Sequence, residues 1–196
     1  MQALKVRIDD HPQFSWHKKV SLKRGDFLKL PDTTDTNLYY VTSGCLRAYI
    51  DNEQGEQTIR FGYTGNFFAA LDSFISEQHS PMALQALRKS EVLVIKKQDF
   101  LDFISFDTDV SGEAKPSLPA STKEKAMPNR DLWSQLQTNL IYGLLERELD
   151  LLTTSPQERY QRVLKRSPHL FQLVPAKYIA NYLRMSPETL SRLRKS

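Results

Sequence analysis

The sequence predicts an α+β fold in three parts: an N-terminal β-roll, a long helix and a C-terminal helix-turn-helix domain. Short β-branched and aromatic runs fill the first half, an apolar helical stripe follows, and two short helical runs flank a tight turn near the end. We expect the β-roll at 1–106, a linker at 107–130, the long dimerisation helix at 131–153 and the helix-turn-helix domain at 154–196.

The first part is rich in strand signals. VSLKRGDFLKL, NLYYVTSGCLRAYI, EQTIRFGY and VLVIKK are short β-forming runs separated by turn residues. DNEQG between two of these runs is typical of a hairpin tip, and QDFLDFI has helical spacing. Many short strands at this spacing predict a roll or barrel.

The middle of the chain changes character twice. The segment 107–130 holds three prolines and mostly polar or charged residues, which predicts a linker. DLWSQLQTNLIYGLLERELDLLTT then predicts a helix whose apolar stripe is wider than one small neighbour would cover. This width favours packing on the same chain and on a second copy, although a helix buried within one chain fits the pattern equally well. The predicted homodimer interface contains Trp133, Leu136, Leu140, Leu144 and Leu151.

Positive charge is concentrated at the end of the chain. Lys/Arg and Asp/Glu balance over 1–106, whereas 155–196 carries nine Lys/Arg against two Asp/Glu. Such a concentration is typical of a nucleic-acid-binding module, with a solvated basic surface as the alternative.

The last residues, YIANYLRMSPETLSRLRKS, fit a helix-turn-helix. Ala180 provides the small residue at the helix contact, Ser186 is a good N-cap and Pro187 takes the first helical position. Arg184 stands where the turn prefers glycine, at a cost on the order of 1 kcal/mol. The positions that should face the core hold Ile179, Leu183, Met185, Leu190 and Leu193.

We expect the second helix to enter the major groove of double-stranded DNA with its N-terminus first. Arg192 can donate to guanine and Glu188 can accept from cytosine. A solvated arginine and a partner of the helix dipole are the respective alternatives. The predicted DNA contacts are Lys177, Ser186, Pro187, Glu188, Thr189, Ser191, Arg192 and Lys195.

From about Val20 to Lys195 the chain resembles the Crp/Fnr superfamily of bacterial transcription regulators, especially its short Bacteroidetes-type members. LYYVTSGCLRAYI, TGNFF, SEVLVIKKQDF, VPAKYIANYL and SPETLSR carry the resemblance. It implies a jelly-roll of the cyclic-nucleotide-binding type and a homodimer that pairs through the long helix. It also implies near-palindromic DNA targets, with an effector in the roll that changes the disposition of the two reading heads.

The resemblance also locates an effector pocket, but a degenerate one. In that family a Glu accepts from the ribose hydroxyl and an Arg neutralises the cyclic phosphate. Here Asn66 replaces the Glu, and Ser80-Pro81-Met82 replaces the arginine pair. A buried phosphate would lack its countercharge, so we expect a different effector or none, and not cyclic AMP. The pocket residues are Gly65, Asn66, Phe67, Phe68, Ser80, Pro81 and Met82.

No cofactor, metal site or catalytic group is predicted. Cys45 is the single cysteine, which excludes a four-thiolate iron–sulfur cluster within one chain. His17, His79 and His169 are candidate haem ligands, although a lone histidine is more often a surface or packed residue. A cupin-like enzyme needs two or three histidines on neighbouring strands, and 20–106 contains only His79.

The sequence therefore predicts a dimeric, sequence-specific DNA-binding transcription regulator. No apolar run approaches the roughly 20 residues needed to cross a bilayer, and MQALKVRIDD has no apolar signal core. We expect a cytoplasmic protein that is not an enzyme and has no membrane partner. The alternative is an interaction module whose DNA binding is lost, which Arg184 in the turn favours.

Overall fold

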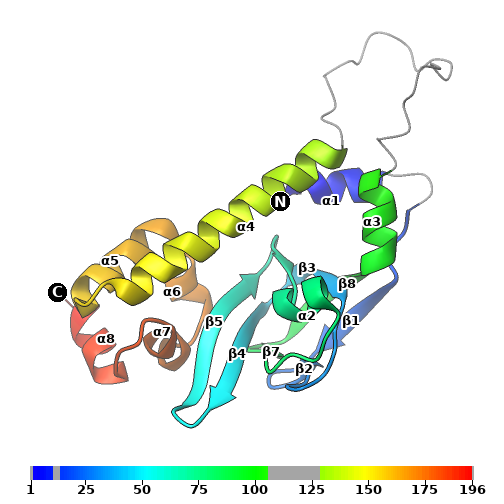
Figure 1. The fold of residues 1–196 in the computed structure, drawn as a ribbon. Helices are drawn as coiled ribbons and strands as arrows, with labels where there is room; N and C mark the ends of the chain where they lie inside the picture. The colour runs from blue at the N-terminus through cyan, green and yellow to red at the C-terminus, as the bar shows by residue number, and fades with distance from the viewer. Residues whose placement is uncertain (1, 11–13, 106–128, 196) are drawn as a thin grey trace, which may run out of the picture.

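The computed structural model describes residues 2–10, 14–105 and 129–195 (Figure 1). Within them it confirms the predicted α+β fold, with a roll of two antiparallel sheets followed by helices. The strand orders are β1-β8-β3-β6 and β2-β7-β4-β5. The strands are β1 (Lys18–Leu22), β2 (Phe27–Lys29), β3 (Asn37–Ser43), β4 (Cys45–Asn52), β5 (Gly55–Tyr63), β6 (Phe67–Phe68), β7 (Ala83–Ala86) and β8 (Ser90–Lys96). The helices are α1 (Gln2–Asp9), α2 (Leu71–Ser76), α3 (Lys97–Ser105), α4 (Asn129–Leu152), α5 (Pro156–Arg166), α6 (Leu170–Leu173), α7 (Ala176–Tyr182) and α8 (Pro187–Leu193).

The two sheets face each other across an apolar core. Alternate residues of β3, β4, β7 and β8 point inward, as the two-residue period of a strand requires, and include the buried Val41, Leu46, Leu84 and Val92. The β4–β5 hairpin turns at DNEQG as predicted, with Asn52 paired to Gly55.

The junction of β3 and β4 requires a glycine. Gly44 has φ of +97°, in the region that favours glycine. A Cβ there would lie 2.2 Å from Ser90 Oγ and 2.6 Å from the Lys89 carbonyl oxygen. Ser90 Oγ in turn accepts from the Cys45 amide at 3.1 Å, so the crowded side chain also holds the start of β4.

A second cluster joins the roll to four helices, α1, α2, α3 and α4. Leu4 and Ile8 of α1 pack with Phe100 of α3, and the ring of Trp133 of α4 lies 5.1 Å from the ring of Phe100. Helix α3 includes the predicted QDFLDFI. The sequence pattern does not predict helix α1, because QALKVRID has no acidic residue in its first turn. Contacts of Leu4 and Ile8 with the rest of the protein stabilise this helix instead.

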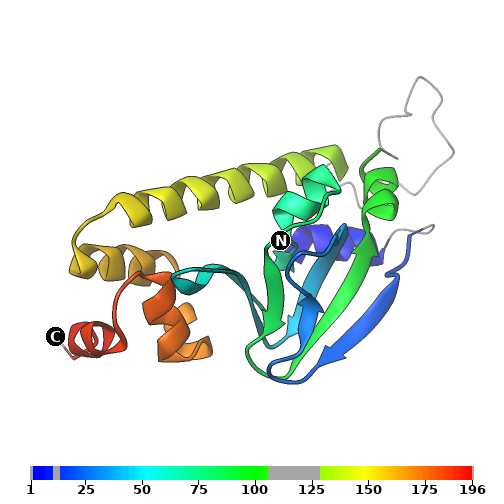
Figure 2. The same ribbon diagram turned by 60° about the horizontal axis from the view of Figure 1, so that its bottom comes forward.

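The predicted linker lies outside the described residues, except for its last two, which begin α4. Helix α4 spans from the roll to the C-terminal head, which we define as α5 to α8 (Figure 2). The head packs on the roll: Cys45 and Leu87 share one apolar cluster with Val163, Ile179 and Leu190. None of the described helices has the length and apolar character needed to traverse a lipid bilayer.

Candidate nucleic-acid interface and effector cassette

Helices α7 and α8 meet across a tight turn. Ala180 is buried at their contact, and its carbonyl oxygen accepts from the Met185 amide at 3.0 Å. Arg184 has φ of +54°, so the non-glycine residue does adopt the left-handed conformation. Of the five positions expected to face the core, Ile179, Leu183 and Leu190 are fully buried, and Met185 and Leu193 are partly buried.

Helix α8 begins as its sequence predicts. Ser186 has an extended backbone, its Oγ accepts from the Thr189 amide at 3.2 Å, and Pro187 follows at the first helical position. The pKa of the Glu188 carboxyl is held below its ordinary value by its own backbone amide, the Ser186 hydroxyl and the Arg192 charge. The exposed Glu188 carboxylate in the first turn of α8 and the exposed Arg192 guanidinium in its last turn lie about one helical turn apart.

Lys177 lies on α7, Ser186 caps α8, Lys195 follows α8, and the other residues predicted to contact DNA lie on α8 itself, next to the C-terminus (Figure 1). All of them are exposed except the half-buried Thr189. The Nζ atom of Lys177 lies 4.6 Å from the ring centroid of Tyr178, which holds its stem along α7. This surface combines both signs of charge with hydroxyl groups, the donor and acceptor types that read base edges.

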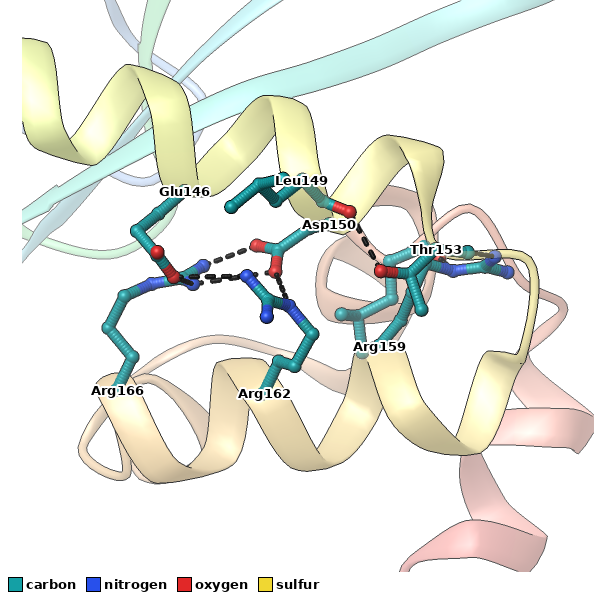
Figure 3. A network of polar contacts seen from close by, with 8 residues as sticks. Glu146, Leu149, Asp150, Thr153, Arg159, Arg162 and Arg166 are labelled. Atoms are coloured by element: carbon teal, nitrogen blue, oxygen red, sulfur yellow. Dashed lines mark hydrogen bonds and ion pairs between the residues drawn. The ribbon is translucent and has the colours of Figure 1, made fainter.

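Arg159 of α5 holds the strained turn. Its Nε donates to the Leu183 carbonyl oxygen at 2.9 Å and its Nη2 to the Arg184 carbonyl oxygen at 3.2 Å. Its Nη1 donates to the carbonyl oxygens of Thr153 and Thr154, between α4 and α5 (Figure 3). One side chain thereby satisfies carbonyls at both the helix junction and the turn, which offsets the cost of the left-handed Arg184.

An ion-pair network fixes α5 to α4 (Figure 3). Asp150 is fully buried and accepts from Arg162 Nε at 3.0 Å and from Arg166 Nη2. Glu146, one turn earlier, accepts from Arg162 Nη2 at 3.1 Å and from Arg166 Nη1 at 2.9 Å. The two carboxylates and two arginines fix the angle between the helices.

This network changes the interpretation of the basic segment. Arg162 and Arg166 face the carboxylates of α4, and Arg159 faces backbone carbonyls, so these three charges do not point toward a nucleic acid. Spacing offers a signal for the network: Glu146 and Asp150 are four residues apart, as are Arg162 and Arg166, so each pair shares a helix face.

The predicted dimer residues divide between two environments. Trp133 and Leu136 pack against the core of their own chain, whereas Leu144 and Leu151 are exposed. Most of the apolar α4 surface that remains available to a partner therefore lies in its C-terminal half. The exposed apolar residues there are Ile141, Tyr142, Leu144, Leu145, Leu149, Leu151 and Leu152.

The predicted effector cassette is internally satisfied. Asn66 Oδ1 accepts from the Tyr63 amide at 3.2 Å, and Phe67 and Phe68 are buried in the roll. Ser80 Oγ donates to the Asp72 carboxylate and accepts from the Met82 amide at 3.0 Å. The polar groups that would have to bind a ligand phosphate already have partners.

Pro81 is exposed. The residues on either side of it bind Lys29, which the sequence pattern does not indicate. Lys29 is only 3% exposed, and its Nζ donates to the carbonyl oxygens of Ser80 at 2.9 Å and Met82 at 2.6 Å. The Asp72 carboxylate and these carbonyl oxygens are acceptors, and the Lys29 ammonium is the cation that they face.

The candidate haem ligands are dispersed. His17, His79 and His169 are exposed and lie before β1, after α2 and at the start of α6. Over the residues that the structure describes, no three His, Cys, Asp or Glu side chains are grouped so that they could hold a metal ion.

Residues 19–107 match the family model of the cyclic nucleotide-binding domain. The chain is 29% identical to the fumarate and nitrate reduction regulatory protein of Vibrio cholerae serotype O1, over 95% of this chain and 70% of that protein. Its fold is similar to that of FixK2 from Bradyrhizobium japonicum, with a TM-score of 0.65 and 18% identity over 91% of this chain and 82% of that one. A CooA mutant from Carboxydothermus hydrogenoformans gives a TM-score of 0.67 at 16% identity, over 97% of this chain and 82% of that one. Residues 19–107 thus form a domain of the cyclic nucleotide-binding type, and the chain as a whole is similar to a regulatory protein, in line with the predicted resemblance to the Crp/Fnr regulators.

Proposed function

We propose that the protein is a homodimeric, sequence-specific DNA-binding transcription regulator that acts in the cytoplasm and catalyses no reaction. The observation that carries this proposal is the capped helix α8, which presents Glu188, Ser191 and Arg192 on the outer surface of a buried two-helix core. A recognition helix needs this combination of a rigid inner face and a polar outer face. The relative from Vibrio cholerae, named a regulatory protein, supports the same conclusion.

In this proposal α8 enters the major groove with Ser186 leading. Arg192 pairs with guanine and Glu188 with the amino group of cytosine, while Lys177 and Lys195 contact phosphates and set the register. The network of α4 and α5 supports the proposal because it gives the head a fixed orientation, which a symmetric dimer needs to meet two half-sites.

The exposed apolar stripe of α4 supports pairing with a second copy. Leu145, Leu149 and Leu152 are 52%, 48% and 70% exposed in the single chain, and burying them on the same residues of a partner removes this surface from water. In this proposal the roll responds to a signal other than a cyclic nucleotide, or to none.

The test is the affinity for DNA from the promoter region of the protein's own gene, measured by fluorescence anisotropy at several salt concentrations. A regulator shows a preference for this DNA over a scrambled sequence at every salt concentration, above a background that weakens as salt rises. Equal affinity for both sequences, or no binding to either, would defeat the proposal and leave an interaction module.

Arg192→Ala is expected to weaken binding to the preferred sequence by roughly 1–3 kcal/mol, because one bidentate contact per half-site is lost. The loss should concentrate at one base pair, which a set of single-base operator variants measured by the same assay can locate. Arg24→Ala, which changes an exposed arginine between β1 and β2, is the control and should bind like the unaltered protein. A loss spread uniformly over all sequences would make Arg192 a phosphate contact.

Leu149→Ala is expected to weaken dimerisation by about 30-fold. About half of this side chain is exposed in the single chain, so its burial on pairing stabilises the dimer by roughly 1 kcal/mol per copy. A symmetric dimer contains two such side chains, so the variant loses this contribution twice. Sedimentation equilibrium gives the dimer dissociation constant. Leu30→Ala, which changes a similarly exposed leucine on the roll, should leave that constant unchanged. If both variants behave alike, α4 does not form the interface.

A further inference from the structure

A cavity of about 380 Å³ lies where the roll, α4 and the head meet. Strand β5 contributes Arg60 and Phe61, α4 contributes Leu140 and Arg147, and α7 contributes Tyr182. Its volume falls within the range of roughly 300–1,000 Å³ that is typical of small-molecule sites. The cavity is separate from the Ser80–Met82 stretch of the cassette, although Asn66 and Phe67 line its edge.

The described residues that line this cavity include two arginines and no Asp or Glu. Among the described residues, the Arg60 guanidinium has no hydrogen-bond or ion-pair partner, and burial lowers its pKa with only the Tyr182 phenol opposing the shift. The Arg147 guanidinium stacks 3.7 Å from the ring centroid of Tyr182 and donates to the Thr58 carbonyl oxygen at 3.4 Å. Its pKa is also lowered, first by burial, with Tyr182 and Asp150 partly opposing.

Both arginines line the same cavity and are partly desolvated, and a bound oxyanion would give each of these cations a charged partner. The planar fork of a guanidinium matches the two oxygens of a carboxylate or phosphate. Most of the other lining residues are apolar or aromatic, with Phe61, Phe67 and Leu136 among them, and Asn66 and Asn139 add two amide groups. An adjoining cavity of about 360 Å³ shares Arg60 and three α4 leucines, so it offers apolar room for a longer body.

We propose that this cavity is a binding site for a small organic oxyanion, a carboxylate or a phosphate monoester with an apolar body, held by Arg60 and Arg147. A ligand there touches the roll through Arg60, the dimer helix through Arg147 and the head through Tyr182. On the proposed function, on which this step rests, the ligand is the effector that sets the position of the reading head.

Isothermal titration calorimetry of the full chain without DNA tests the site with defined probes. 4-Phenylbutyrate supplies a carboxylate and phenyl phosphate a phosphate. Uncharged 4-phenylbutyramide and inorganic phosphate separate the contributions of head group and body. At least one of the first two probes binds, and its head group identifies the preferred anion. Binding of neither, equal binding of the amide, or equal binding of inorganic phosphate overturns the proposal; a cavity filled by a partner's side chains gives the first of these results.

Arg60→Met keeps the length of the side chain and removes its charge, so it should weaken the bound probe by about 10- to 100-fold. Arg88→Met, an exposed arginine of the roll, is the matched control and should bind the probe normally. Should Arg60→Met fail to fold, Arg60→Lys keeps the charge, loses the fork and still weakens the probe several-fold. Equal affinities of the Arg60 and Arg88 variants would place the probe elsewhere.

The two proposals fail separately. Probe binding is measured without DNA, so a protein that binds the probe and no DNA keeps the site and loses the regulator function. A probe that binds at Arg60 and leaves the anisotropy with promoter DNA unchanged keeps the site and overturns its coupling to the head.

Discussion

Asp150→Ala is expected to lower the free energy of unfolding by about 3–5 kcal/mol, the usual cost of removing one partner from a buried ion pair. Asp150 is fully buried between Arg162 and Arg166, and Glu146 alone cannot satisfy both guanidinium groups. Burial would lower the pKa of Arg166, but its hydrogen bond and charge interaction with Asp150 raise it above the ordinary value. The carboxylate is thus what keeps this partly buried cation charged at low cost.

Urea unfolding followed by circular dichroism, at one fixed protein concentration, measures this loss. Asp150→Asn keeps the shape and removes the charge, so it should lie between the unaltered protein and Asp150→Ala. Glu148→Ala, an exposed carboxylate on the same helix, is the control and should change stability by less than about 0.5 kcal/mol. A loss at Asp150 as small as that at Glu148 would show that the network contributes nothing.

Gly44→Ala is expected to destabilise the protein by about 2–4 kcal/mol through two separate effects. The positive φ of Gly44 costs a side chain on the order of 1 kcal/mol. The added Cβ also overlaps Ser90 Oγ and the Lys89 carbonyl oxygen, at 2.2 and 2.6 Å, and overpacking of this kind costs typically 1–3 kcal/mol. One of the two crowded atoms, the Lys89 carbonyl oxygen, belongs to the backbone, so a rotamer change of Ser90 cannot remove the whole overlap.

Gly25→Ala separates the two effects under the same unfolding assay. Gly25 has nearly the same φ, +93°, but an added Cβ there meets no atom within 4 Å. It should therefore lose only about 1 kcal/mol, the backbone contribution. Equal losses at Gly44 and Gly25 would mean that the β3–β4 junction relaxes around the extra methyl group.

The parts of this molecule that depend on local pattern are predictable from the sequence. The hairpin tip at DNEQG, the helix in QDFLDFI and the capped α8 each follow from residues within one turn or one element. The turn at Arg184 shows the same: the left-handed backbone is expected from its position in the helix-turn-helix, although the residue is not glycine.

The contacts that join distant elements could not be predicted in this way. The net charge of 155–196 does not predict that Arg162 and Arg166 face carboxylates of α4, because a net charge does not say where each side chain points. Likewise Arg60 and Arg147 are 87 positions apart, and they line one cavity only because three elements converge there. Helix α1 depends on Leu4 and Ile8 meeting α3 and α4, which its own weak pattern does not indicate.

The docking of α7 on β5 bears on how the chain is made. Asn181 accepts from the Thr58 amide at 2.7 Å and donates to the Glu56 carbonyl oxygen at 2.7 Å, and the first pair is 123 positions apart in the chain. Closing so long a loop is slow for a free chain, but synthesis proceeds from the N-terminus, and domains generally fold in that order. We therefore expect the roll to fold before α7 leaves the ribosome, so that the head folds against a surface that is already in place.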